Sequence, residues 1–182
     1  HFSGYASDFQ EINVSLGPAG ELRYPSYNSH DSGTGYPTRG ALQCYSSLAI
    51  KDFQNKMIAK YGSLAGINAA WGSSLTSTSQ LSPPTNLPSF FTNGDYKNNT
   101  YGKDFVDWYN QSLVTHGITV LNNVIATLGT TFPSAKIGYK VPGVHWCMTN
   151  PSYPRAAEVA AGLIQTSVDF GADATGHGYA KI

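Results

Sequence analysis

Two short stretches in which polar and apolar residues alternate stand on either side of a largely helical middle. Residues 10–16 alternate as a half-buried β-strand does, and residues 136–141 repeat the pattern. Between them, apolar residues recur at helical spacing over 41–60, 63–71 and 103–128. The pattern therefore predicts a strand, a series of helices and a second strand, which is the order of a β/α unit.

Long polar segments separate these elements. Residues 17–40 and 72–100 are rich in Gly, Pro, Ser, Thr and Asn, and we expect both to be irregular connections. Ser63 is expected to cap the second helix. The tail, residues 147–182, is predicted to be loop with one weak helix around 155–161. Enlarged loops after the strands are typical of barrel enzymes, which keep their sites at the C-terminal ends of the strands.

Two strands cannot close a barrel, because a (β/α)8 barrel needs eight strands and about 250 residues. We therefore expect the fold class α/β, as a portion of a (β/α)8 TIM barrel with long loops at the strand C-terminal ends. Residues 1–182 are interpreted as the central part of a single catalytic domain, a fragment whose remaining strands lie elsewhere. The first residue is His1 rather than Met, which we take to mean that a preceding segment was removed or omitted.

The charge of the chain limits its partners. Charged residues make up 12% of the sequence, and 11 basic residues balance 11 acidic ones. Because no basic run occurs, we expect no binding to nucleic acid or to an anionic membrane surface. No apolar run approaches the ~20 residues that a membrane span requires, so we expect no transmembrane segment.

The remaining surface is rich in hydroxyl, amide and aromatic groups, which suit a neutral sugar ligand. A low-charge secreted protein without any sugar ligand would have the same composition, and both interpretations stay open on composition alone. The two cysteines, Cys44 and Cys147, are too few for a disulfide framework. A bridge between them is one interpretation, and two buried free thiols are the favoured one.

One of only three glutamates stands just past the first predicted strand. Glu21 lies within the Gly/Pro-rich run Gly17–Tyr27, whereas Glu11 and Glu158 lie elsewhere. A partly desolvated carboxyl group at a strand end can stay protonated and act as a general acid. The alternative is a structural ion pair with Arg23 on the same turn. The residues alone leave both interpretations open.

A second polar group follows the second predicted strand. Lys140 interrupts an apolar run, and His145 and Trp146 come five residues later. Lys140 could hold a sugar hydroxyl while His145 and Trp146 form the wall of a site. In the alternative, Lys140 extends to solvent and the other two are core residues.

These segments resemble the β-amylases. The run Gly17–Tyr27 is similar, residue for residue, to the segment that carries the catalytic acid in that family. Residues 140–146 match the family's Lys-x-x-Gly-x-His-Trp stretch, and residues 40–45 look like the family's helix opening. Residues 61–72 and 101–105 are similar to bacterial members. The likeness covers nearly the full chain, and its first motif is highly specific.

The resemblance implies an exo-acting hydrolase that releases β-maltose from the non-reducing ends of α-1,4-glucans, such as starch and maltooligosaccharides, with inversion. By position, Glu21 would be the general acid and Arg23 would steady its loop. We expect a secreted, extracellular monomer that requires no cofactor. The calcium site of bacterial members would lie outside these residues, and we identify no metal ligands among them. The residues that would line the sugar subsites are Tyr27, Lys140, Gly143, His145 and Trp146.

The chain departs from the family pattern in one respect. Inversion needs a second carboxylate roughly 6.5–9.5 Å from the first to activate water. The family supplies it from a Gly-Glu-Asn motif that this sequence lacks, so we expect the isolated chain to be inactive. A retaining barrel glycosidase, with carboxyl groups ~5–5.5 Å apart and Asp31 or Asp95 as candidates, is one alternative. A glucan-binding or regulatory relative without catalysis is another.

Overall fold

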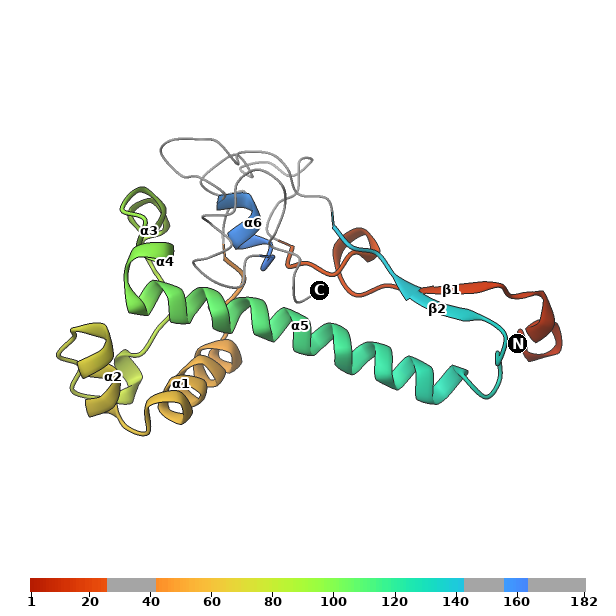
Figure 1. Cartoon of the computed structure of the whole chain (residues 1–182), viewed down its shortest axis with the longest axis horizontal. Coiled ribbons are helices and arrows are strands. Elements are labelled where there is room, and N and C mark those ends of the chain that lie inside the picture. The colour runs from red at the N-terminus through yellow and green to blue at the C-terminus, as the bar shows by residue number, and fades with distance from the viewer. Residues whose placement is uncertain (26–41, 143–155, 164–182) are drawn as a thin grey trace.

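The computed structural model describes residues 1–25, 42–142 and 156–163, and the statements below concern these ranges. One long helix, α5 (Thr100–Leu128), runs through the molecule (Figure 1). The strand pair lies along its C-terminal half, and the shorter helices α1 to α4 gather around its N-terminal half. The elements are, in chain order, η1 (Ser3–Asp8), β1 (Glu11–Val14), η2 (Pro18–Gly20), α1 (Ser47–Tyr61), α2 (Leu64–Trp71), η4 (Thr78–Gln80), α3 (Leu87–Thr92), α4 (Asp95–Asn98), α5, β2 (Lys136–Tyr139) and α6 (Ala156–Ala160).

The two strands form a parallel pair. Glu11 lies opposite Lys136, and Val14 lies opposite Tyr139. Parallel strands need a long crossover between them, and here the helices α1 to α5 supply it. The predicted strands over 10–16 and 136–141 are confirmed, with a shorter ladder at their centre. Because the strands are parallel, the residues that follow each of them meet at the same edge of the sheet.

The first two helices begin and end at capping residues. Helix α1 starts at Ser47 rather than at the predicted residue 41, because the side chain of Ser46 accepts a hydrogen bond from the first turn. It ends at Gly62, which takes the left-handed conformation with φ of 75°. Ser63 caps α2 as predicted. The caps therefore define α1 and α2 as two helices meeting at a sharp corner.

The prediction of an irregular connection over 72–100 is wrong in part, since η4, α3 and α4 lie within it. Asn86 caps α3 through the backbone N–H of Ser89, and Pro88 occupies the first turn, where a proline needs no N–H partner. Phe90 and Phe91 give this short helix a buried face. Pro88 therefore lies at the start of a helix instead of breaking one. The high content of Pro, Ser, Thr and Asn in residues 72–100 could not distinguish these two cases.

Helix α5 begins earlier than predicted. Asn99 caps it by accepting from the backbone N–H of Gly102, so the helix starts at Thr100 rather than at 103. Gly102 lies against the backbone of Asp95 so closely that any side chain would overlap the Asp95 carbonyl. This contact fixes α4 on the first turn of α5. No helix in the described ranges is long and apolar enough to cross a membrane.

Two buried clusters hold the elements together. The larger one is rich in aromatic residues and joins helices α1 to α6. The smaller one joins the turn after β1 to α5 and to the residues around the end of α6. The C-terminal half of α5 leaves Ile118 and Ile125 about half exposed. The smaller cluster contains Leu16, Leu22, Leu113, Ala161 and Leu163.

A buried carboxylate joins three helices of the larger cluster. Asp104 on α5 accepts hydrogen bonds from the ammonium of Lys60 at 2.6 Å, the hydroxyl of Tyr61 at 2.7 Å and the indole N–H of Trp71 at 2.7 Å. The Asp104 side chain is 4% exposed, so these donors replace the water that it loses on burial. The lysine is half exposed, and its own share of the stabilisation is correspondingly small.

We expect Asp104→Asn to lower the free energy of unfolding by about 2 kcal/mol, because the NH2 that replaces one carboxylate oxygen cannot accept from the donors that face it. Urea unfolding of the full-length protein measures the change. Asp8→Asn is the matched control, since Asp8 is exposed and its change should cost no more than about 0.5 kcal/mol. Equal effects at the two positions would show that the three donors of Asp104 contribute little.

Candidate active site

The turn after β1 brings Glu21 to the end of β2. The chain leaves β1, passes through η2 and returns so that Glu21 forms a parallel bridge with Lys140. The backbone N–H of Leu22 donates to the Lys140 carbonyl at 3.0 Å. Glu21 and Lys140 therefore lie together at the C-terminal edge of the strand pair, where barrel enzymes keep their catalytic groups.

This turn is tight enough to require its glycines. A Cβ atom on Gly17 would lie 2.5 Å from the Glu21 carbonyl oxygen and 2.7 Å from that of Arg23. Ala19 and Gly20 both take positive φ, at 56° and 81°. A left-handed alanine is costly and persists only where its surroundings hold it, a situation that is common at functional sites. The backbone around Glu21 is thus held in one conformation.

The side chain of Glu21 forms an ion pair with Arg23. The distance from Arg23 Nε to Glu21 Oε2 is 2.7 Å, and the side chains are 7% and 26% exposed respectively. Arg23 Nη1 also donates to the Tyr24 carbonyl at 3.4 Å. The structural ion pair that the sequence offered as an alternative is therefore present. Because it engages one carboxylate oxygen and leaves Glu21 partly exposed, it orients the carboxylate while leaving it accessible.

Lys140 joins the same turn from the other strand. Its side chain is exposed, and its ammonium donates to the carbonyl of Ala19 at 3.3 Å. The structure thus brings together Glu21, Arg23 and Lys140 of the residues that the sequence singled out. The candidates Tyr27, Gly143, His145 and Trp146 lie outside the described residues, as do Asp31 and Cys147.

Other acidic candidates lie apart from Glu21 in the described structure. Asp95 begins α4 and accepts from the side-chain amide of Asn99, at the opposite end of α5 from the strands (Figure 1). Glu11 is exposed on β1 and accepts from Asn13 at 2.9 Å. Glu158 is 1% exposed. None of the groups within 1–25, 42–142 and 156–163 forms a cluster of three His, Cys, Asp or Glu side chains able to hold a metal ion.

Tyr24 and Tyr109 also hold the turn, and the sequence interpretation did not single them out as site residues. The two rings stack with centroids 4.1 Å apart, and the Tyr24 hydroxyl donates to the Tyr109 carbonyl at 3.2 Å. The helical stripe of α5 predicts that Tyr109 is buried, and a buried tyrosine hydroxyl needs a hydrogen-bond partner. The sequence thus indicated that the Tyr109 hydroxyl would be hydrogen-bonded, but the spacing of apolar residues could not identify its partner.

A family assignment follows from comparison with known proteins. The family model described as "Glycosyl hydrolase family 14" matches residues 1–177. This chain belongs to glycosyl hydrolase family 14. The resemblance recognised in the motif around Glu21 is therefore confirmed, and it extends over almost the whole sequence.

Curated family 14 relatives are named β-amylases. The "Thermophilic beta-amylase" of Thermoanaerobacterium thermosulfurigenes is 51% identical over 92% of this chain, and the chain spans 30% of that protein. The "Beta-amylase" of Niallia circulans is 45% identical over 96% of this chain, which spans 31% of it. The chain thus spans about a third of the length of these relatives.

A solved structure from the same family has the same fold. The "catalytic domain of beta-amylase" from Paenibacillus polymyxa matches with a TM-score of 0.81 and 46% identity, covering 88% of this chain and 38% of that domain. The expected fold class, α/β as a portion of a (β/α)8 barrel, is confirmed by this likeness. The assignment of 1–182 to a single domain remains a prediction.

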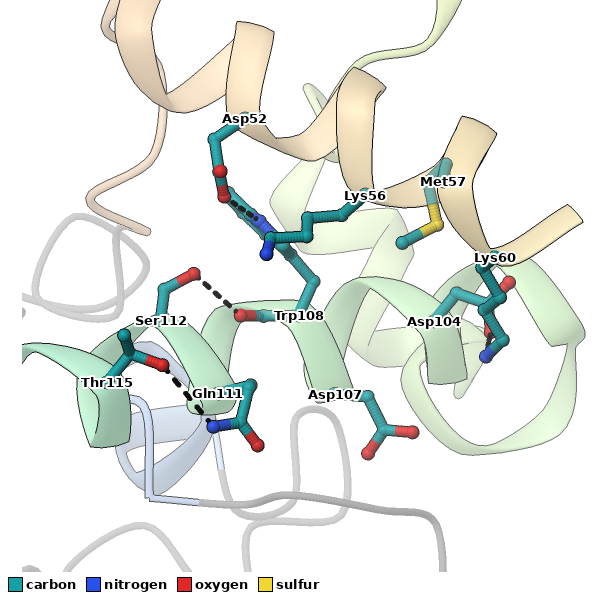
Figure 2. Close-up of a pocket in the computed structure, with 10 residues that line it drawn as sticks. All are labelled: Asp52, Lys56, Met57, Lys60, Asp104, Asp107, Trp108, Gln111, Ser112 and Thr115. Atoms are coloured by element: carbon teal, nitrogen blue, oxygen red, sulfur yellow. Dashed lines mark hydrogen bonds and ion pairs between the residues drawn. The ribbon is translucent and has the colours of Figure 1, made fainter. Parts of the chain in front are cut away.

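The family 14 chain also has a cavity of about 500 Å³ between α1 and α5, which shares no residue with the Glu21 turn (Figure 2). Several of its polar groups bond one another. The indole N–H of Trp108 donates to Asp52, Lys60 pairs with Asp104, and Gln111 donates to Thr115. The residues that line it are Asp52, Lys56, Met57, Lys60, Asp104, Asp107, Trp108, Gln111, Ser112 and Thr115.

Burial changes the acidity of groups close to the stacked tyrosines. Desolvation raises the pKa of Cys44 from 9.0 to about 12, and Cys44 is buried as a free thiol. Desolvation also raises the pKa of Tyr109 well above 10.0, and raises that of Tyr24. These groups are neutral in the folded chain at ordinary pH. The expectation of a buried free thiol is confirmed for Cys44.

We expect the free energy of unfolding to fall as the pH rises from about 9 toward 12. Cys44 and Tyr109 stay protonated in the fold while their unfolded counterparts ionise, so the unfolded state binds fewer protons in this window. The stabilisation is complete below about pH 9 and is lost progressively above it. Urea unfolding at several alkaline pH values tests this. Cys44→Ala should make the decline shallower, and a stability independent of pH in this window would contradict the assignment.

Proposed function

We propose that this chain is the acid-bearing part of a β-amylase catalytic domain. In this proposal the protein hydrolyses α-1,4-glucans such as starch from their non-reducing ends and releases β-maltose with inversion. The observation that carries it is Glu21, a partly exposed carboxylate oriented by Arg23 at the C-terminal edge of a parallel strand pair. The names of the family 14 relatives support the substrate class.

In the proposed reaction Glu21 acts as the general acid. Its carboxyl proton passes to the glycosidic oxygen as the bond between that oxygen and the anomeric carbon breaks, so the departing sugar leaves as a neutral alcohol. Water adds to the anomeric carbon from the opposite face and gives its proton to a carboxylate base. Attack from that face inverts the configuration and yields the β anomer.

The base would come from residues other than the glutamates of the described structure. Glu11 projects from an exposed position on the acid's own strand, and its carboxylate accepts from Asn13. The side chain of Glu158 is buried and therefore has little access to solvent water. We infer that a later part of the catalytic domain supplies the second carboxylate.

Arg23 and Lys140 would have supporting roles. Arg23, itself buried, holds one oxygen of Glu21 and so limits the rotation of the carboxyl group. Lys140 carries an exposed ammonium at the same strand edge, where it could donate to a sugar hydroxyl. Tyr27, Gly143, His145 and Trp146 are proposed as further subsite residues from the family motif.

We further propose that the protein acts as a secreted monomer and needs no cofactor for this reaction. A carboxylic acid, a carboxylate base and water balance the hydrolysis without a redox partner or an activated donor. In bacterial relatives with calcium, the ion would lie outside the residues named here.

Glu21→Gln should reduce kcat on maltooligosaccharides by about 10²–10⁴-fold, because an amide cannot supply the proton. Maltose affinity should change by less than about tenfold, since an acid acts chiefly in the transition state. Proton NMR of the first product, measured on the full-length protein, follows both the rate and the anomer. Glu11→Gln is the matched control on the same strand and should keep wild-type activity.

The role of Glu21 would be wrong if Glu21→Gln kept more than about a tenth of the wild-type rate. An α-anomeric first product would favour a retaining glycosidase instead. Maltose binding without turnover in the unmodified full-length protein would favour a glucan-binding relative. The anomer of the product and the presence of turnover therefore distinguish the three interpretations.

Residues 1–182 alone should release no measurable maltose from soluble starch, because the proposed acid would act without its base. Reducing-sugar assays against the full-length protein at equal molar concentration provide the comparison. Maltose release by the isolated chain would mean that both carboxylates lie within these 182 residues.

A further inference from the structure

Tyr109 on α5 occupies the junction between the Glu21 turn and two other segments of the chain. We propose that Tyr109 is a positioning residue for Glu21, which acts through Tyr24 and Arg23 to set the orientation of the carboxylate. This inference rests on the proposed role of Glu21 as the acid. Tyr109 lies on α5, outside the run Gly17–Tyr27 that contains Glu21.

Tyr109 contacts all three segments directly. Its hydroxyl accepts from the backbone N–H of Gln43 at 2.8 Å and donates to the carbonyl of Ala160 at 3.0 Å. Its ring stacks on that of Tyr24, with an angle of 12° between the planes. Its own carbonyl accepts from the Tyr24 hydroxyl. At 1% exposure, Tyr109 makes these bonds without competition from water.

Tyr24 has little freedom to move at this junction. Its backbone N–H donates to the Ala161 carbonyl at 3.1 Å, and its ring lies against Gly162. A Cβ atom on Gly162 would approach the Tyr24 ring to 2.7 Å. The side-chain amide of Asn110 holds the Gly162 carbonyl at 2.7 Å. Tyr24 is therefore fixed through its backbone, its ring and its hydroxyl at once.

The position of Tyr24 is passed on to Glu21 by Arg23. The guanidinium of Arg23 donates to the Tyr24 carbonyl through Nη1 and to Glu21 Oε2 through Nε. Because Arg23 is buried, a shift of Tyr24 must move either the guanidinium or the carboxylate that it holds. A misplacement of about 1 Å at a reacting group can cost about 100-fold in rate.

Tyr101 on the same helix provides a matched comparison. Its hydroxyl also donates to a backbone carbonyl, that of Ser82, at 2.9 Å. Its ring packs edge-on against Trp71, within the larger cluster. Burial raises the pKa of both phenols, although Tyr101 is only partly buried whereas Tyr109 is almost fully buried. Among the described residues, Tyr101 bonds Ser82 and packs against Trp71, whereas Tyr109 contacts the Glu21 turn.

The test is Tyr109→Phe against Tyr101→Phe in the full-length protein, with kcat, KM and thermal unfolding measured for each. Tyr109→Phe keeps the stacked ring but removes the hydroxyl bonds to Gln43 and Ala160, and the residue after Ala160 holds the Tyr24 backbone N–H. We expect the loss of this anchor to shift Tyr24 and to lower kcat by about 10- to 100-fold while KM stays within about twofold, because the acid is displaced and the sugar contacts are not. Tyr101→Phe also removes a hydroxyl bond to a backbone carbonyl, so it should lower the melting temperature but leave kcat unchanged. Tyr24→Phe, which removes the hydroxyl bonds to the Tyr109 carbonyl and to the Ser112 side chain, should give the same split between kcat and KM.

Equal kcat losses in Tyr109→Phe and Tyr101→Phe would overturn the proposal, as would a kcat of Tyr109→Phe within about twofold of wild type per folded molecule. If Tyr109→Phe fails to fold, Tyr24→Phe decides by the same criterion. Full activity of Glu21→Gln would instead refute the proposed function. An inactive Glu21→Gln together with a fully active Tyr109→Phe would refute the positioning role alone.

Discussion

The parallel pairing of β1 with β2 is the constraint on which the rest of the described structure depends. Parallel strands cannot be joined by a tight turn, so a crossover must carry the chain from one end of the sheet back to the other. Here that crossover contains α1 to α5, and the length of α5 spans the return (Figure 1). The same pairing brings Glu21 beside Lys140, because both follow strands that end at one edge. The backbone topology alone therefore places Glu21 beside Lys140.

Polar side chains on α5 connect this topology to the surrounding segments. Asp104 receives three donors from the helices at one end, whereas Tyr109 and Asn110 bond the carbonyls of Ala160 and Gly162 farther along. His116 reaches the carbonyl of Leu16 at 2.9 Å, where the chain leaves β1. Helix α5 therefore bonds backbone carbonyl groups of two separate segments, one around Leu16 and one at Ala160 and Gly162.

The sequence predicted features that depend on neighbours along the chain. The alternation of β1 and β2, the cap Ser63 and the Glu21–Arg23 pair all involve residues within a few positions of one another. The errors arose where a residue type fits both a loop and a helix. Pro88 indicated an irregular connection, but it lies in the first turn of α3. The contacts of Tyr109 could not be predicted, because they join residues 43, 109 and 160 and no local pattern encodes such partners. The motif around Glu21 identified the family, whereas the contacts that hold this motif in place are known only from the structure.

The long separation between β1 and β2 has a consequence for the order of folding. The contacts between α1 and α5 join residues 44 to 56 positions apart, as Lys60–Asp104 and Asp52–Trp108 do, and these separations are much shorter than that of the strand pair. The strand pair closes a loop of more than a hundred residues, and the entropy of closing it must be overcome before its hydrogen bonds form. Glu21 and Lys140 belong to that late contact. We therefore expect the helical cluster to form before the strand pair, so that a destabilising substitution among the helices would slow the assembly of the Glu21 site.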